Sequence, residues 1–180
     1  MKLKTSIILC SLASATTMPA VANSAFDLYA GVSVGVGAQT LFGDGKNETN
    51  TSQSFGAMFG IDVPVFRGEV EYTYIGTSDS HASIGFANAY FKMPSTVIRP
   101  YLGLGVGLMF AGEENKQYNE KYDTKPAYQG MLGVTIDVPK LPFKFDVEAH
   151  AIYIPDVLRF GNERPDILHY EAKIKLRYLF

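Results

Sequence analysis

The sequence predicts an all-β fold, an eight-stranded antiparallel up-and-down transmembrane β-barrel, and three observations lead to it. Apolar and polar residues alternate along most of the chain, which is the pattern of strands with two different faces. Charges of both signs gather on one of those faces in several segments. Short proline-containing turns alternate with longer polar connections between the segments, as they do in antiparallel membrane barrels.

The first 22 residues have the features of a secretory signal peptide. Lys2 and Lys4 give a positive start, an apolar stretch follows, and small residues end the segment, as such peptides require. We therefore predict a signal peptide over Met1–Ala22 and one barrel domain over residues 23–180.

Composition excludes several classes of protein. Cys10 is the only cysteine and lies in the predicted signal peptide, so the remaining chain has no disulfide or thiolate chemistry. Loss of that segment changes the net charge from −2 to −4, which predicts no nucleic-acid partner. No later apolar run reaches the roughly 18 residues of a membrane-spanning helix.

The alternation marks three regular strands in the first part of the chain. Each starts with a phenylalanine and has apolar or small residues at every second position, and we place these strands at Phe26–Gln39, Phe55–Val63 and Phe66–Ile75. In each, polar or small residues fill the positions between. One face is therefore apolar along its whole length.

The fourth predicted strand, Ser83–Met93, is less regular. Asn88 and Tyr90 are assigned to the inward face with Lys92. Ile84 and Phe86 break this order of faces. An extra residue in one strand has this effect, so we expect a β-bulge there.

Four further segments alternate as clearly and complete the barrel: Ile98–Phe110, Tyr128–Val138, Phe143–Ile154 and Tyr170–Phe180. The last is an eleven-residue run, close to the 9–11 residues with which a tilted strand crosses a bilayer. Longer polar connections are expected after the odd-numbered strands, at Thr40–Ser54, Gly76–Ala82, Ala111–Pro126 and Pro155–Ile167.

The polar faces of three strands carry a set of charged residues that we expect inside the barrel. Its members are Arg67, Glu69, Glu71, Asp146, Glu148, His150, Glu171, Lys173, Lys175 and Arg177. Buried charges need partners, so acidic Asp146 and Glu148 are expected to pair with the cations of the last strand. Glycines on the first and fifth strands would leave room for these long side chains. An interior of eight strands is just filled by side chains, which makes a pore unfavourable.

The last strand resembles the C-terminal strand of bacterial outer-membrane β-barrels. The residues that carry this resemblance are Tyr170, Ile174, Leu176, Tyr178 and Phe180. In that family the terminal aromatic pattern is the signal that the barrel-assembly machinery reads. The whole chain after residue 22 resembles the small barrels of the OmpA/OmpX type, and more closely the opacity-type proteins of the porin superfamily, through Asn88-x-Tyr90 and Arg99-Pro100-Tyr101-x-Gly-x-Gly.

This resemblance implies a non-enzymatic protein of the Gram-negative cell outer membrane with a structural or adhesin-like role. The implied partners are outer-membrane lipid and lipopolysaccharide, the assembly machinery, and a host or matrix ligand. Such a ligand would contact the cell-surface loops at Phe42–Gln53, Glu113–Lys125 and Asp156–Pro165. A lipid A-modifying enzyme and a narrow porin remain as alternatives.

The sequence predicts no catalytic, cofactor-binding or metal-binding residues. His81 has several serines near it in a polar connection, an arrangement that is usually solvated loop. His150 and His169 fall on the inward face near acids, where a structural network is the simpler interpretation. Glu113, Glu114, Glu120 and Asp123 alternate with lysines, which is unlike a calcium site.

Overall fold

The computed structural model describes residues 26–43, 46–77, 81–94, 98–111, 124–138, 140–155 and 166–180, without the side chains of 41–48 and 111. Within these ranges it contains eight strands: β1 Asp27–Gly43, β2 Lys46–Asp62, β3 Phe66–Thr77, β4 His81–Lys92, β5 Ile98–Ala111, β6 Lys125–Asp137, β7 Phe143–Ile154 and β8 Asp166–Leu179. None of the described residues forms a helix that is long and apolar enough to cross a membrane. The predicted signal peptide lies outside the described residues and stays a prediction.

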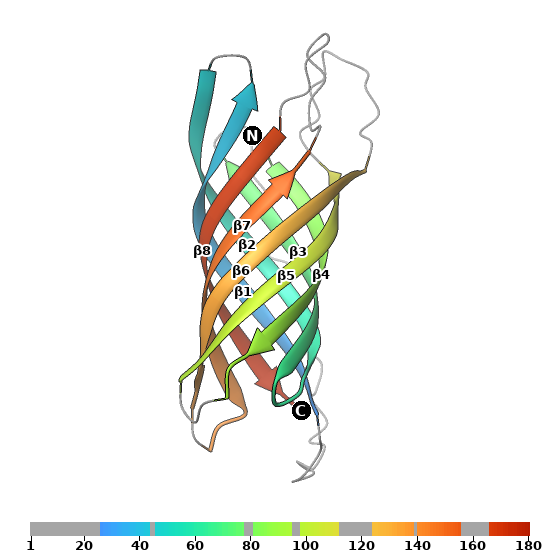
Figure 1. Ribbon diagram of the computed structural model, residues 1–180, viewed down its shortest axis with the longest axis vertical. Helices are drawn as coiled ribbons and strands as arrows, with labels where there is room; N and C mark the ends of the chain where they lie inside the picture. Colours follow the sequence, from blue (N-terminus) through green and yellow to red (C-terminus); the bar gives the residue numbers. More distant parts are fainter. Residues whose placement is uncertain are drawn as a thin grey trace, which may run out of the picture.

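The eight strands form one closed antiparallel barrel in chain order (Figure 1). Each strand pairs with the next, and β1 also pairs with β8 along fourteen residue positions, from Tyr29↔Leu179 to Phe42↔Asp166. The backbone N–H of Phe180 donates to the carbonyl of Leu28 (2.9 Å) and extends this seam by one bond. The predicted fold class is confirmed.

The outer wall is apolar and the interior is polar. Outward side chains such as Val70, Leu104 and Val106 are exposed by 58–75%, whereas the alternate residues are buried, as the strict alternation along β3 shows. A soluble barrel buries its apolar face, so this arrangement is the reverse of a soluble one. Exposed aromatic side chains lie near both ends of the wall, among them Phe66, Phe143, Tyr178 and Phe180 at one end and Phe55, Tyr74, Phe110, Tyr128, Tyr153 and Tyr170 toward the other.

The first connection differs from the prediction. Residues predicted as the loop Thr40–Ser54 belong almost entirely to β1 and β2, and the two strands stay paired out to Gly43↔Lys46. In Figure 1 this blue-to-teal hairpin extends beyond the neighbouring strands. Past Gln39 apolar and polar residues no longer alternate, because Leu41 and Phe42 of β1 are adjacent apolar residues and Lys46–Ser54 of β2 is polar on both faces. The pattern that marks a half-apolar strand is therefore absent although the pairing continues. β6 and β8 also begin earlier than predicted, at Lys125 and Asp166. There the inward positions carry the apolar residues Ala127 and Ile167, which hide the alternation of polar and apolar faces.

The fourth strand also needs a correction. A register shift lies at Ser83 and Ile84, which pair with Ala111 and Met109. The extra residue is therefore Phe110 of β5, and the irregularity is not in the fourth strand itself, where the bulge was predicted. Ile84 and Phe86, however, are buried on the same face as Asn88 and Tyr90, and they do not break the order of faces. They belong to an apolar layer inside the barrel, the isoleucine layer, formed by Ile75, Ile84, Phe86, Ala127, Ile152, Ile154 and Ile167.

The short turns follow β2, β4 and β6, as predicted. Val63 donates its N–H to the carbonyl of Phe66 (2.9 Å) in the first. In the third, Leu141 donates to the carbonyl of Val138 (3.2 Å). Lys140 lies between Val138 and Leu141 with a φ of 68°. This is the left-handed backbone conformation, which residues other than glycine rarely adopt.

Candidate functional site

The polar interior of the barrel is the best-defined site in the described structure. The structure puts all ten residues of the predicted charge set inside, and none is more than 5% exposed. They come from β3, β7 and β8, which alternate charged and apolar residues over these stretches. Because β7 and β8 are paired neighbours, their charges meet along one wall and face β3 across the interior.

The cations of β8 bind acids on two sides of the interior. Arg177 Nε lies 2.6 Å from Asp146, and Lys175 Nζ lies 3.0 Å from Glu148. These are pairings expected from the sequence. Lys173 instead binds Glu71 on β3 and Glu171 on its own strand, at 2.9 and 2.8 Å.

Arg67 is the cation of β3, and its side chain is fully enclosed. Its two terminal nitrogens each lie 3.1 Å from a carboxylate, one on Asp146 and one on Glu148. The guanidinium carbon lies 3.7 Å from the centre of the Tyr90 ring and 4.6 Å from that of Tyr101. The planar group therefore receives both charge compensation and contact with two aromatic faces.

Neutral side chains donate further hydrogen bonds to two of the carboxylates. Tyr29 and Tyr90 donate hydroxyl hydrogen bonds to Glu69 at 2.7 and 2.8 Å, and Tyr101 donates to Glu148 at 2.6 Å. The alternation puts all three tyrosines on the polar faces of their strands, but the predicted charge set does not include them. Their position at alternate sites was the signal that could have included them.

Glycines make the space that these tyrosines occupy. A methyl group on Gly60 would lie 2.5 Å from the Tyr29 hydroxyl, and one on Gly133 would lie 2.6 Å from that of Tyr101. Such separations are well below van der Waals contact, so a side chain there requires the ring to move. Gly103 on β5 does the same for Tyr90, as expected from the inward glycines of that strand.

A second group of charges lies at the end of the barrel that carries the short turns. Asp62 accepts from Lys92, from Lys144 (3.1 Å) and from Arg177 (3.2 Å). Arg99 binds Asp137 at 2.8 Å. Sequence reasoning missed this group because most of its members are single charges at the ends of different strands.

The two buried histidines belong to the same network. His150 contacts Glu148 through Nε2 and lies 3.3 Å from the Gln129 amide oxygen. His169 lies 3.5 Å from Ser52 Oγ and, through its other nitrogen, 3.5 Å from Glu171.

The order Ser52, His169 and Glu171 matches that of a hydrolytic triad, but its geometry is loose. Both separations are at the outer limit of a hydrogen bond, and Glu171 already accepts a 2.5 Å bond from Ser54. All three side chains are buried, so a substrate would have to enter the filled interior. This geometry fits a structural role of the three residues better than a catalytic one.

His81 was predicted to lie in a loop, but it is the first residue of β4. Its side chain is exposed and stacks on Tyr74 with ring centres 5.9 Å apart. The acidic residues Glu113, Glu114, Glu120 and Asp123 lie outside the described residues. Among those that the structure does describe, no three His, Cys, Asp or Glu side chains form a group suited to a metal ion.

The predicted assembly residues all face outward. Tyr170, Ile174, Leu176, Tyr178 and Phe180 are exposed on β8 and directly after it. Tyr178 packs edge-to-face against both Phe143 and Phe180, with ring centres 5.3 Å apart in each case. Recognition of this row by an assembly machinery stays a prediction.

Solved structures with the same architecture are known. Neisserial surface protein A is similar at 15% identity and a TM-score of 0.57, covering 85% of this chain and 97% of that one. The N-terminal β-barrel domain of Pseudomonas aeruginosa OprF is similar at 12% identity and a TM-score of 0.53, covering 83% of this chain and 97% of that one. The chain has the fold of the small outer-membrane β-barrels.

The same fold also occurs in a protein described as an enzyme. The outer membrane enzyme PagL is similar at 15% identity and a TM-score of 0.50, covering 81% of this chain and 97% of that one. No family model matches the chain, and no curated protein matches it. The likeness therefore concerns the fold, which serves both enzymes and non-enzymatic proteins.

Proposed function

We propose that the chain is a non-enzymatic integral protein of the outer membrane of a Gram-negative bacterium, with a structural or adhesin-like role at the cell surface. The observation that carries the proposal is the inverted barrel, with an apolar wall outside and a filled network of ion pairs inside. An exposed wall of this kind is stable only against lipid. A closed barrel is also one of the two architectures that can span a membrane through its backbone.

The packed interior favours a scaffold over a transport protein. Arg67, Lys175 and Arg177 each bind at least two carboxylates. An ion passing through would have to break these buried ion pairs, and a buried charge without its partner is energetically costly. We therefore expect no steady current when the purified protein is inserted into planar lipid bilayers, and a reproducible unit conductance would restore the narrow-porin alternative.

The adhesin-like half of the proposal draws on the protruding hairpin of β1 and β2. Thr49, Asn50, Thr51 and Gln53 are polar and exposed there. Paired strands hold such side chains in fixed positions, and a rigid surface loses less entropy on binding than a flexible loop does. The other two predicted contact segments, Glu113–Lys125 and Asp156–Pro165, lie almost entirely outside the described residues.

Two measurements test the proposal. Folded outer-membrane barrels change gel mobility on boiling, so the chain should shift in the outer-membrane fraction, and a soluble chain without a shift would refute the location.

Replacing Asn50, Thr51 and Gln53 by alanine should lower the binding of whole cells to host cells or matrix. Exchange of Val34 for Ala, on the lipid side of β1, is the control. Equal binding by both variants would refute the role of the hairpin.

The enzymatic alternative has its own test because PagL shares the fold. Mass spectra of lipid A from cells with and without the protein should be identical. A mass difference equal to one acyl chain would support a lipid A-modifying enzyme instead.

A further inference from the structure

The outer wall has a hollow along β4. The outward residues in the middle of this strand are Gly85, Ala87 and Ala89, so three consecutive outward positions carry no side chain larger than a methyl group. Ala87 and Ala89 are exposed. Elsewhere the wall carries mostly valine, leucine, isoleucine and aromatic side chains.

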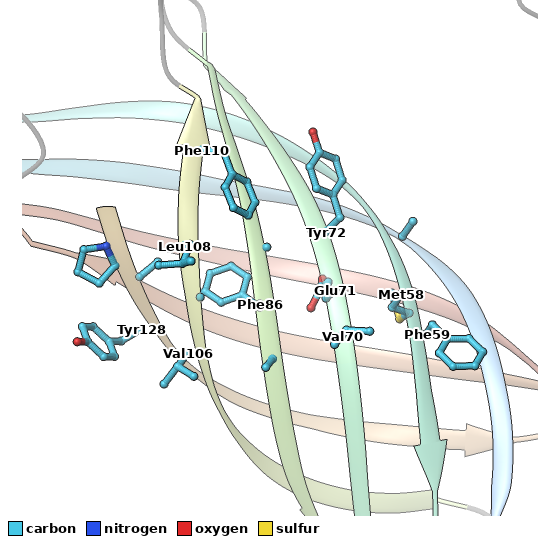
Figure 2. A pocket seen from close by; sticks show the side chains of 16 residues that line it. Met58, Phe59, Val70, Glu71, Tyr72, Phe86, Val106, Leu108, Phe110 and Tyr128 are labelled. Atoms are coloured by element: carbon cyan, nitrogen blue, oxygen red, sulfur yellow. The ribbon is translucent and has the colours of Figure 1, made fainter. Parts of the chain in front are cut away.

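Larger side chains on both neighbouring strands form the sides of the hollow. Tyr72 and Leu108 lie opposite Gly85 in the two strand pairs, and Val70 and Val106 lie opposite Ala87. The resulting groove has a volume of about 890 Å³ and reaches β2 and β6 through Phe59 and Tyr128. Figure 2 shows aromatic rings from β2, β3, β5 and β6 lying around this part of β4.

Aromatic side chains lie at both ends of the row of small residues. At the end nearer the protruding hairpin, the Phe110 ring lies over Gly85, so that a methyl group on Gly85 would come within 3.0 Å of it. Tyr72 donates a hydrogen bond to Ser83 there (3.0 Å). At the other end Phe66 and Phe91 pack edge-to-face with ring centres 5.5 Å apart.

These dimensions suit one hydrocarbon chain. The row of small outward residues from Gly85 to Ala89 spans about 13 Å at the rise of a β-strand, close to the roughly 15 Å of one hydrocarbon leaflet. Its first two members, Gly85 and Ala87, line the groove itself. The backbones of β3 and β5 are about 9.5 Å apart, two strand spacings, and their side chains narrow this further. A second barrel is convex and would touch the rims without filling the floor.

Among the described outward residues of β3 and β4, polar side chains gather at the end nearer the protruding hairpin. Ser83, Tyr72, Tyr74 and the exposed His81 face outward above the Phe110 ring. A lipid with its head group at this end would therefore have hydrogen-bonding side chains beside the head group and apolar ones along its chain. In an outer membrane the leaflet on this side consists of lipopolysaccharide.

We propose that the groove along β4 binds one acyl chain of lipopolysaccharide as a specific site. This inference rests on the proposed outer-membrane location. It goes beyond general contact with lipid, because it assigns one position on the wall, one leaflet and one class of lipid.

Filling the floor tests the proposal. The protein would be reconstituted in vesicles of phosphatidylethanolamine and lipopolysaccharide, released into mild detergent, and weighed by native mass spectrometry. Ala87→Phe fills the groove, and Ala87→Leu fills it with less bulk. Ala149→Phe is the matched control, because Ala149 is an exposed outward alanine on β7 that does not line the groove.

The wild type and Ala149→Phe should retain one lipopolysaccharide molecule. In both Ala87 variants the fraction of protein with bound lipopolysaccharide should fall at least tenfold. Equal retention by all four proteins would overturn the proposal, as would retention of phosphatidylethanolamine alone. Gel mobility before and after boiling separates the two proposals: a folded membrane barrel with unchanged lipid retention refutes the groove site only, whereas a chain that never enters the membrane refutes the proposed function.

Discussion

Replacement of Arg67 by methionine should destabilise the barrel strongly. The side chain is fully buried between Asp146 and Glu148 and contacts two aromatic rings. Methionine fills similar space but leaves the carboxylates with less compensation. Removal of one partner from a buried ion pair costs about 3–5 kcal/mol, and loss of the contacts with the rings adds to this by about 1 kcal/mol.

Arg99→Met is the matched control for this prediction. Arg99 also binds a carboxylate, that of Asp137, but its side chain is 29% exposed at the rim of the barrel. An ion pair in contact with water contributes about 0–1 kcal/mol. Urea unfolding in lipid vesicles, followed by circular dichroism and by gel mobility, gives the free energy of unfolding for each protein. If Arg67→Met lost less than about 1 kcal/mol, or no more than Arg99→Met, the interpretation of the interior as an interdependent network would be wrong.

Three further predictions use the same unfolding assay. Gly133→Val should lower the free energy of unfolding by about 1–3 kcal/mol through overpacking, because the new side chain would meet the Tyr101 hydroxyl. Gly130→Val, on the same strand with open space beside it, should leave the free energy of unfolding unchanged, and equal losses in both variants would contradict the packing argument. Lys175→Met should be more damaging than Lys175→Met combined with Glu69→Gln, since the second change removes a carboxylate left unpaired, and strictly additive losses would count against this coupling. Ile152→Asn should cost about 1–3 kcal/mol by burying unpaired amide groups in the isoleucine layer, and an unchanged midpoint would show that water reaches that layer.

Alternation along the chain, together with the alternating short and long connections, was enough to predict the strand number, the closed antiparallel order and most of the inward face. Arg67, Glu148 and Lys175 lie inside because every second residue of a strand shares a face, and this rule needs no knowledge of the partners. The same rule located the short turns, since each ends a run of alternation.

The pairing across the interior did not follow from the sequence. Lys173 binds Glu71 rather than an acid of β7 because the stagger between strands sets which side chains meet at one height, and stagger is a property of the closed barrel. Ile84 and Phe86 were misread for a related reason. An apolar residue on the inward face looks like a break in the pattern until the isoleucine layer is seen. The length of the first hairpin was missed because strand pairing does not require an apolar face.

The distribution of charge among the strands has a consequence for the order of folding. β8 supplies Lys173, Lys175 and Arg177, whereas Glu69, Glu71, Asp146 and Glu148 come from strands made earlier. A barrel whose final strand is not yet in place would hold these carboxylates close together without most of their counterions. Closure of the seam between β1 and β8 therefore neutralises the interior and completes the backbone pairing in one step, so that an incomplete barrel is disfavoured twice over.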